Sequence, residues 1–295
     1  MEEPDKTEAI PEKPKKKKRH FIVWVLLIGL LLMLLGQILG EVMCLPFILL
    51  FPDMEPMWQF SLQYFSFIGI IVLVVGYCMI AEKKLMPLFR SARRGGERGN
   101  TLKEFGLGVL IGFVMNGACI LAAWLHGDLD FSVGTFYPVY LIVTFLCVTV
   151  QSGAEEILTR GYILGALRER YPVWVAVAAN ALLFGALHLF NNGITVWSEL
   201  SIILIGLGLS FAVICRGSLW MAIAIHTMWN FTQSILFGLP NSGIVSQGSF
   251  LHLEAAKGSF FYDAVFGVEG AFPAIVVELL LIAGLCLVLK KKKAD

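Results

Sequence analysis

Residues 21–51 read FIVWVLLIGLLLMLLGQILGEVMCLPFILLF, an apolar run in which Glu41 is the only charged side chain. A helix crosses a bilayer with about 20 predominantly apolar residues. The run is therefore long enough to span a membrane, with a tilt or a break near Gly40 and Glu41. It is too long for the apolar region of a secretory signal and has no small-residue cleavage site, so we expect a retained anchor.

Seven more apolar stretches follow, at residues 59–81, 105–126, 138–168, 172–190, 197–215, 218–238 and 271–289. The 295-residue chain is 57% hydrophobic and 15% charged, whereas soluble domains are about 45–50% apolar and about 25% charged. The six cysteines lie in or beside apolar runs and show no metal-binding spacing. The sequence thus predicts an all-α fold, a polytopic membrane helix bundle of about eight transmembrane helices.

The distribution of basic residues predicts the orientation of this bundle. With a cytoplasmic N-terminus, eight spans place 22 of the 23 lysines and arginines on the cytoplasmic side and leave only Lys257 outside. We therefore expect a basic cytoplasmic tail at 1–20, a transmembrane bundle at 21–289, and a basic cytoplasmic tail at 290–295. A net charge of +1 does not suggest a nucleic-acid partner. The longest outer connection, 239–270, is not assigned an element.

The fourth apolar stretch contains charged residues, in the sequence QSGAEEILTR at positions 151–160. Charged side chains are costly at mid-bilayer and usually face the protein interior, where they serve function. Arg160 follows Glu156 at the four-residue spacing of an ion pair on one helical face. Glu155 is turned about 100° away from Glu156, so we interpret Glu156 with Arg160 as a structural pair and Glu155 as the carboxylate left for chemistry.

Two later spans add polar groups that suit peptide hydrolysis. The fifth carries Asn180, Phe184 and His188 at four-residue steps, and the seventh carries His226 and Asn230. A carboxylate, two imidazoles and an amide can activate water and bind an oxyanion. These groups lie at the same depth in the membrane only if the fourth helix continues to Arg168. This continuation places Arg160 within the membrane.

Other interpretations of these residues remain open. A single intramembrane His or Asn often serves helix packing, and a Glu–Arg pair can line a transport path. A non-catalytic immunity or scaffold protein is therefore one alternative. A transporter is another, although the halves show no repeat and no paired broken helices. The chain has no HExxH motif and no GxSxG motif.

Three motifs in this order resemble the signatures of the CPBP family, which includes the type II CaaX prenyl endopeptidases and bacterial Abi proteins. They are Glu155-Glu156-x-x-x-Arg160, Phe184-x-x-x-His188 and His226-x-x-x-Asn230. The resemblance covers residues 140–235, and no motif position departs from the pattern.

The resemblance implies an intramembrane endopeptidase in the cell membrane that cuts a membrane-associated peptide or lipidated protein. It gives Glu155 the role of base, lets His188 assist the water or the leaving group, and lets His226 and Asn230 hold the oxyanion. Glu156, Arg160 and Phe184 would support these residues. The family has been described both with and without a catalytic metal. If zinc or another divalent metal binds, the ligands would be Glu155, His188 and His226, and we favour no tightly bound metal.

Overall fold

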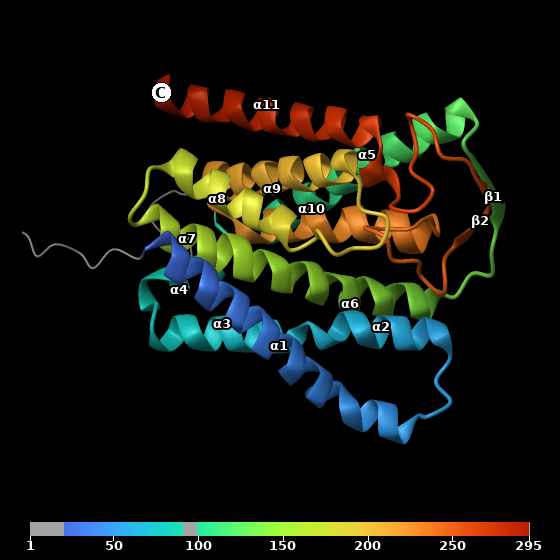
Figure 1. Ribbon diagram of the computed structural model, residues 1–295, viewed down its shortest axis with the longest axis horizontal. Coiled ribbons are helices and arrows are strands. Elements are labelled where there is room, and N and C mark those ends of the chain that lie inside the picture. Colours follow the sequence, from blue (N-terminus) through green and yellow to red (C-terminus); the bar gives the residue numbers. More distant parts are fainter. Residues whose placement is uncertain (1–20, 91–98, 295) are drawn as a thin grey trace, which may run out of the picture.

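The computed structural model describes residues 21–90 and 99–294, which form a helical bundle with one small sheet (Figure 1). The predicted tail at 1–20 lies outside the described residues. The elements run in the order α1 (Ile22–Leu50), α2 (Pro56–Ser66), α3 (Ile68–Ile80), η1 (Lys83–Leu85), α4 (Met86–Phe89), α5 (Leu102–His126), β1 (Leu129–Val133), α6 (Pro138–Glu156), η2 (Ile157–Ile163), α7 (Leu164–Arg168), α8 (Val173–Ala186), α9 (Val196–Arg216), α10 (Leu219–Phe231), η3 (Thr232–Leu236), β2 (Leu251–Ala256), η4 (Val268–Gly270) and α11 (Phe272–Ala294).

Most of the predicted spans coincide with long helices. Within the described residues, six helices are long and apolar enough to cross a membrane, at Ile22–Leu50, Pro56–Ile80, Leu102–His126, Pro138–Arg168, Val196–Arg216 and Phe272–Leu289. The two other predicted spans correspond to α8 and to α10 continued by η3. The chain is thus a multi-pass helical membrane bundle, as the composition predicted.

The fifth predicted span, 172–190, is too long. Helix α8 has 14 residues and ends at Ala186. Beyond it the backbone tightens into a turn in which the amide of His188 donates to the carbonyl of Gly185 at 2.8 Å. The apolar residues Leu187, Leu189 and Phe190 continue the hydrophobic run past this turn, which is why hydropathy alone overestimated the helix.

The fourth helix continues to Arg168, as the depth of the polar residues required. Helix α6 passes without interruption into η2, which is a single stretch of π-helix, and then into α7. Arg160 lies in the π-helical stretch and has no exposed surface. A membrane-embedded arginine is therefore part of this fold.

Small residues let α1 lie very close to its neighbours. A Cβ atom on Gly40 would lie 1.6 Å from the carbonyl oxygen of Ser66, and one on Gly36 would lie 2.6 Å from Cα of Ile70. Such contacts are typical of membrane helices that pack through small residues. Helix α1 runs unbroken past Gly40 and Glu41, so the break allowed there by the sequence does not occur.

The two ends of the bundle carry different elements. The N-terminal end of α1 and the C-terminal end of α11 lie at the same end, together with α4 and α7 (Figure 1), as an even number of crossings requires. At the opposite end β1 pairs antiparallel with β2 from the long connection 239–270, an element that the sequence analysis did not predict. The interior helix α10 packs against α5, α6 and α9 and carries two of the predicted site residues.

Candidate active site

A cavity of about 240 Å³ inside the bundle brings together all four predicted catalytic residues, Glu155, His188, His226 and Asn230. They come from α6, from the turn after α8, and from α10. The remaining lining residues are Met33, Gln63, Tyr64, Phe67, Ile70, Gln151, Leu158, Thr159, Phe184, Leu187, Asn191, Asn241, Ser242 and Ile244.

The two adjacent glutamates have different surroundings. The side chain of Glu155 is 22% exposed and lines the cavity, whereas that of Glu156 is fully buried. Nη1 of Arg160 donates to Oε1 of Glu156 at 2.9 Å. Oε2 of Glu155 is buried and has no hydrogen-bond partner among the described residues, so this carboxylate oxygen is left unsatisfied.

Arg160 is held on several sides as well as by Glu156. Its Nη1 donates to Oγ1 of Thr159 at 2.8 Å, and its Nη2 donates to the carbonyl of Gly206 at 3.1 Å. The guanidinium carbon lies 4.3 Å from the ring centroid of Phe184. A buried charge needs such partners because removing it from water is costly. Phe184 thus covers the ion pair on the side of α8.

His226 lies between the two glutamates. Its Nδ1 is 3.0 Å from Oε1 of Glu156, and its Nε2 is 3.9 Å from Oε2 of Glu155. A carboxylate only accepts hydrogen bonds, so Nδ1 carries a proton and donates it to Glu156. The longer gap between Nε2 of His226 and Oε2 of Glu155 exceeds a direct hydrogen bond.

The π-helical stretch begins directly after the two glutamates. Oγ1 of Thr159 donates to the backbone carbonyl of Glu155 at 2.5 Å. The backbone hydrogen bonds follow the π-helical pattern over Ile157–Ile163. Single π-helical turns inside α-helices are frequent at functional sites. Glu155 and Thr159 line the cavity beside this stretch, whereas Arg160 lies in the protein interior.

His188 is positioned by the end of α8. Its Nδ1 lies 2.7 Å from the carbonyl oxygen of Phe184, which only accepts, so Nδ1 donates and Nε2 is the free nitrogen. Asn180, predicted on the same face, lies elsewhere: its Nδ2 donates to Oγ of Ser210 at 3.0 Å. Asn180 therefore does not line the cavity, although it shares a helical face with Phe184.

A chain of amide hydrogen bonds links Asn230 to Glu155. Nδ2 of Asn241 donates to Oδ1 of Asn230, and Nδ2 of Asn230 donates to Oε1 of Gln151, both at 3.2 Å. Nε2 of Gln151 then donates to Oε1 of Glu155 at 2.5 Å. These contacts fix the orientation of both amides, and among the described residues they leave one N–H of Asn230 without an acceptor.

The comparisons with known proteins agree with the three motifs. Residues 136–232 match the family described as type II CAAX prenyl endopeptidase Rce1-like. This segment is similar to the Rce1-like family. The comparisons with curated proteins and with solved structures gave no match. The matched residues contain every motif position, so the predicted resemblance to CPBP-type membrane proteases is confirmed for this segment.

The Rce1-like segment does not contain every residue of the cavity. Asn241, Ser242 and Ile244 follow it, and Tyr64 and Gln63 precede it on α2. Gln151 and Thr159 are additional polar residues with a signal in the sequence, since they lie four residues before and after Glu155 on the same helical stripe. Asn241 lies in an irregular connection, where periodicity gives no information.

The arrangement of donors does not fit a metal ion. Among the described residues, no three His, Cys, Asp or Glu side chains are grouped to hold one. The predicted ligand set of Glu155, His188 and His226 is therefore not assembled, and no step is assigned to a metal.

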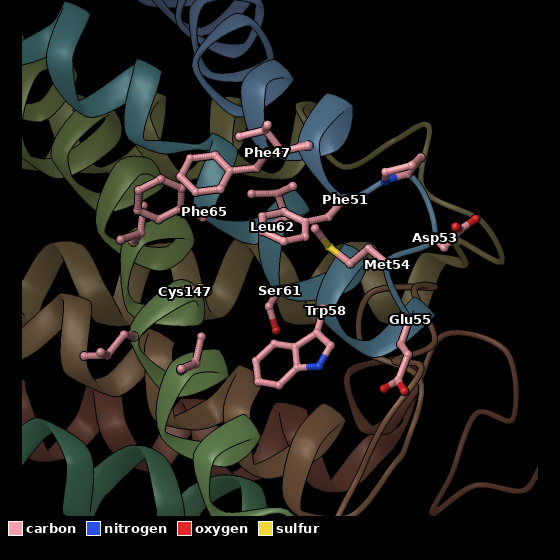
Figure 2. Close-up of a pocket in the computed structure, with 15 residues that line it drawn as sticks. Phe47, Phe51, Asp53, Met54, Glu55, Trp58, Ser61, Leu62, Phe65 and Cys147 are labelled. Atoms are coloured by element: carbon pink, nitrogen blue, oxygen red, sulfur yellow. The ribbon is translucent and has the colours of Figure 1, made fainter.

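A larger apolar groove lies between α1, α2 and α6, outside the catalytic cavity (Figure 2). Its volume is about 860 Å³, and its polar residues are Ser61, Asp53 and Glu55. The other lining residues are Phe47, Leu50, Phe51, Pro52, Met54, Trp58, Leu62, Phe65, Val143, Leu146, Cys147 and Val150. Val150 immediately precedes Gln151, so the groove approaches the catalytic cavity along α6.

Proposed function

We propose that the protein is an intramembrane endopeptidase that hydrolyses a peptide bond in a membrane-associated protein or peptide. The observation that carries this proposal is the unpartnered Oε2 of Glu155, which faces Nε2 of His226 in a cavity shared with His188 and Asn230. The Rce1-like match supports a membrane peptidase in general.

In the proposed reaction Glu155 is the general base. Its Oε2 takes a proton from a water bound beside Nε2 of His226, and the water oxygen forms a bond to the carbonyl carbon of the substrate. General bases act over hydrogen-bond distances, so in the proposed reaction the water enters as the 3.9 Å gap between the buried Oε2 of Glu155 and Nε2 of His226 widens. Gln151 holds the carboxylate in place by donating a hydrogen bond to its other oxygen, Oε1.

Asn230 and His226 bind the oxyanion that forms on the substrate carbonyl. The free N–H of Asn230 supplies one hydrogen bond, and its amide is held in place by Gln151 and Asn241. Nε2 of His226 supplies a second when the ring is doubly protonated, with Nδ1–H donating to Glu156. Donors fixed in advance stabilise developing charge strongly.

His188 serves the leaving group. In the doubly protonated ring Nδ1 donates to the carbonyl of Phe184, and Nε2–H delivers its proton to the amide nitrogen while the C–N bond breaks. The proton taken from water by Glu155 then restores His188 by way of the cavity. Protons balance over the cycle, and the products are a carboxylic acid and an amine.

The apolar groove between α1, α2 and α6 is proposed to hold an apolar part of the substrate. Its lining is almost wholly hydrophobic, and it ends one residue from Gln151 on α6. Asp53 and Glu55 lie at its edge (Figure 2), which favours a basic group beside the apolar segment. An aliphatic or aromatic membrane segment flanked by Lys or Arg therefore fits best.

The test uses purified protein and an internally quenched peptide that the parent cleaves. We expect Glu155→Gln and His188→Ala to abolish cleavage while the protein keeps its fold. Glu199→Gln is the matched control, because Glu199 also lies on a membrane helix but lines neither the catalytic cavity nor the groove. Cleavage by Glu155→Gln at the parent's rate would contradict the proposal and favour a binding or immunity role.

A further inference from the structure

A second, smaller cavity of about 40 Å³ lies behind the catalytic residues. Five residues line both this cavity and the catalytic one and form the wall between the two: Phe184, His188, His226, Asn230 and Ser242. The small cavity also reaches two buried carboxyl groups, Glu269 of η4 and Glu278 of α11. The mechanism described above uses neither of them.

The two carboxyl groups differ in how their oxygens are satisfied. Oε1 of Glu269 accepts from Nε1 of Trp229 at 3.0 Å, and its Oε2 accepts from Nε2 of Gln233 at 2.6 Å. Oε1 of Glu278 accepts from Oγ of Ser201 at 2.7 Å. Oε2 of Glu278 has no hydrogen-bond partner among the described residues, although the side chain is only 1% exposed.

This difference indicates which group carries a proton. Two buried carboxylates near one another cannot both remain ionised at low cost. Glu269 has donors on both oxygens and is the better carboxylate. Glu278 has one donor and a free Oε2 beside the cavity, where a proton on Oε2 would become a hydrogen-bond donor.

No arginine or lysine compensates these carboxyls from the lining of the small cavity. Helix α11 packs against α5, α9 and η4. The titratable groups facing Glu278 are Cys119 of α5 and Glu269 of η4, with His188 and His226 across the cavity. On α9, Glu199 lies against Gly185 of α8, and Arg216 at the other end of that helix is bound to Glu104.

We propose that Glu278 stores a proton and exchanges it with His188 through water in the small cavity. A single water needs roughly 10–15 Å³ of such space, so the cavity can hold at least one. Oε2–H of Glu278 gives its proton by way of this water to Nε2 of His188, which passes it to the leaving amine as the C–N bond breaks. The proton that Glu155 took from the hydrolytic water returns through His188 to Glu278.

This inference rests on the proposed function, and it makes Glu278 a positioning residue that acts through His188. With a proton supplied by Glu278, His188 can protonate the leaving amine while Glu155 still holds the proton taken from water. The bond between Ser201 and Glu278 also joins α9 to α11, so a purely structural role has to be separated from proton storage.

Two variants make that separation. Glu278→Gln keeps an oxygen that can accept from Ser201 but cannot release a proton at neutral pH. Ser201→Ala removes the bond between α9 and α11 but keeps the carboxyl. We expect Glu278→Gln to lower kcat by roughly 10- to 100-fold with KM unchanged and to remove the basic limb of the pH profile. Ser201→Ala should keep the parent's pH profile.

An infrared measurement tests the stored proton without any substrate. The parent and Glu155→Gln should show the carbonyl stretch of a protonated carboxyl at neutral pH, and Glu278→Gln should lack it. An unchanged band in Glu278→Gln would overturn the proposal, as would a parent-like kcat and pH profile in that variant. If instead Glu155→Gln cleaves at the parent's rate, the proposed function fails, and the infrared band still decides whether Glu278 is protonated.

Discussion

Nδ1 of His226 lies 3.0 Å from Oε1 of Glu156, the same oxygen that accepts a hydrogen bond from Arg160. One buried carboxylate thus connects a guanidinium in the protein interior with an imidazole in the wall of the cavity. The sequence interpretation assigned Glu156 to Arg160 alone. Its position behind His226 means that changes at Glu156 should affect both stability and activity.

Replacing Glu156 by alanine should destabilise the protein by about 3–5 kcal/mol, because it leaves Arg160 as an uncompensated buried charge. The double variant Glu156→Leu/Arg160→Leu removes both charges and should recover much of this loss without recovering activity, since His226 still lacks its acceptor. Thermal unfolding in detergent measures the effect. A double variant no more stable than Glu156→Ala would show that the ion pair is not the cause.

Asn230→Ala should reduce kcat by about 10²–10³-fold with a small change in KM, because it removes a fixed donor to the oxyanion. Steady-state kinetics on a cleaved peptide measures this. Asn241→Ala is the control: it removes the group that orients Oδ1 of Asn230 but leaves the donor, so its loss should be smaller. Equal losses in the two variants would argue against a direct role for the Asn230 amide.

Cys147→Trp should raise KM with little change in kcat, because a large ring fills the groove and removes binding that the ground and transition states share. Cys147 is labelled in Figure 2, where it lies in the wall that α6 contributes. Cys147→Ser changes the side chain without filling the groove and should keep the parent's KM. An unchanged KM in Cys147→Trp would mean that the substrate does not use this groove.

Burial raises the pKa of Glu269 above its ordinary value, against the opposing effect of hydrogen bonds from Gln233 and Trp229. A raised pKa in the folded state means that folding favours the protonated form. Stability should therefore fall as pH rises from about 4.3, the pKa of an unfolded glutamate, through the higher folded pKa, and then level off.

The pH dependence can be measured as the unfolding temperature across this range. Glu269→Gln cannot ionise, so its unfolding temperature should fall less than that of the parent over the same interval. A parent and a variant with identical pH dependence would exclude Glu269 as the group responsible.

The sequence predicted the bundle and the grouping of the site for a physical reason. The length of an apolar segment determines whether it can cross a membrane. Charged side chains within a membrane segment almost always face the protein interior. The long fourth helix followed from the depth of Glu155 relative to His188, and the structure confirms it.

Periodicity could not predict features that depend on the backbone leaving regular geometry. The turn that places His188 after α8 and the π-helical stretch after Glu156 both depart from ideal helical spacing. Asn241 and strand β2 lie in a long connection whose contacts form between segments far apart in the sequence. These contacts are set by tertiary packing, which local pattern does not encode.

The central claim is that Glu155 activates water for peptide hydrolysis, and isotopically labelled water tests it most directly. A peptide cleaved in water enriched in heavy oxygen should carry the label in its new carboxylate when the parent or Glu199→Gln is used. With Glu155→Gln, labelled product should form about 10²–10⁴-fold more slowly. Labelled product formed by Glu155→Gln at the parent's rate would contradict the account.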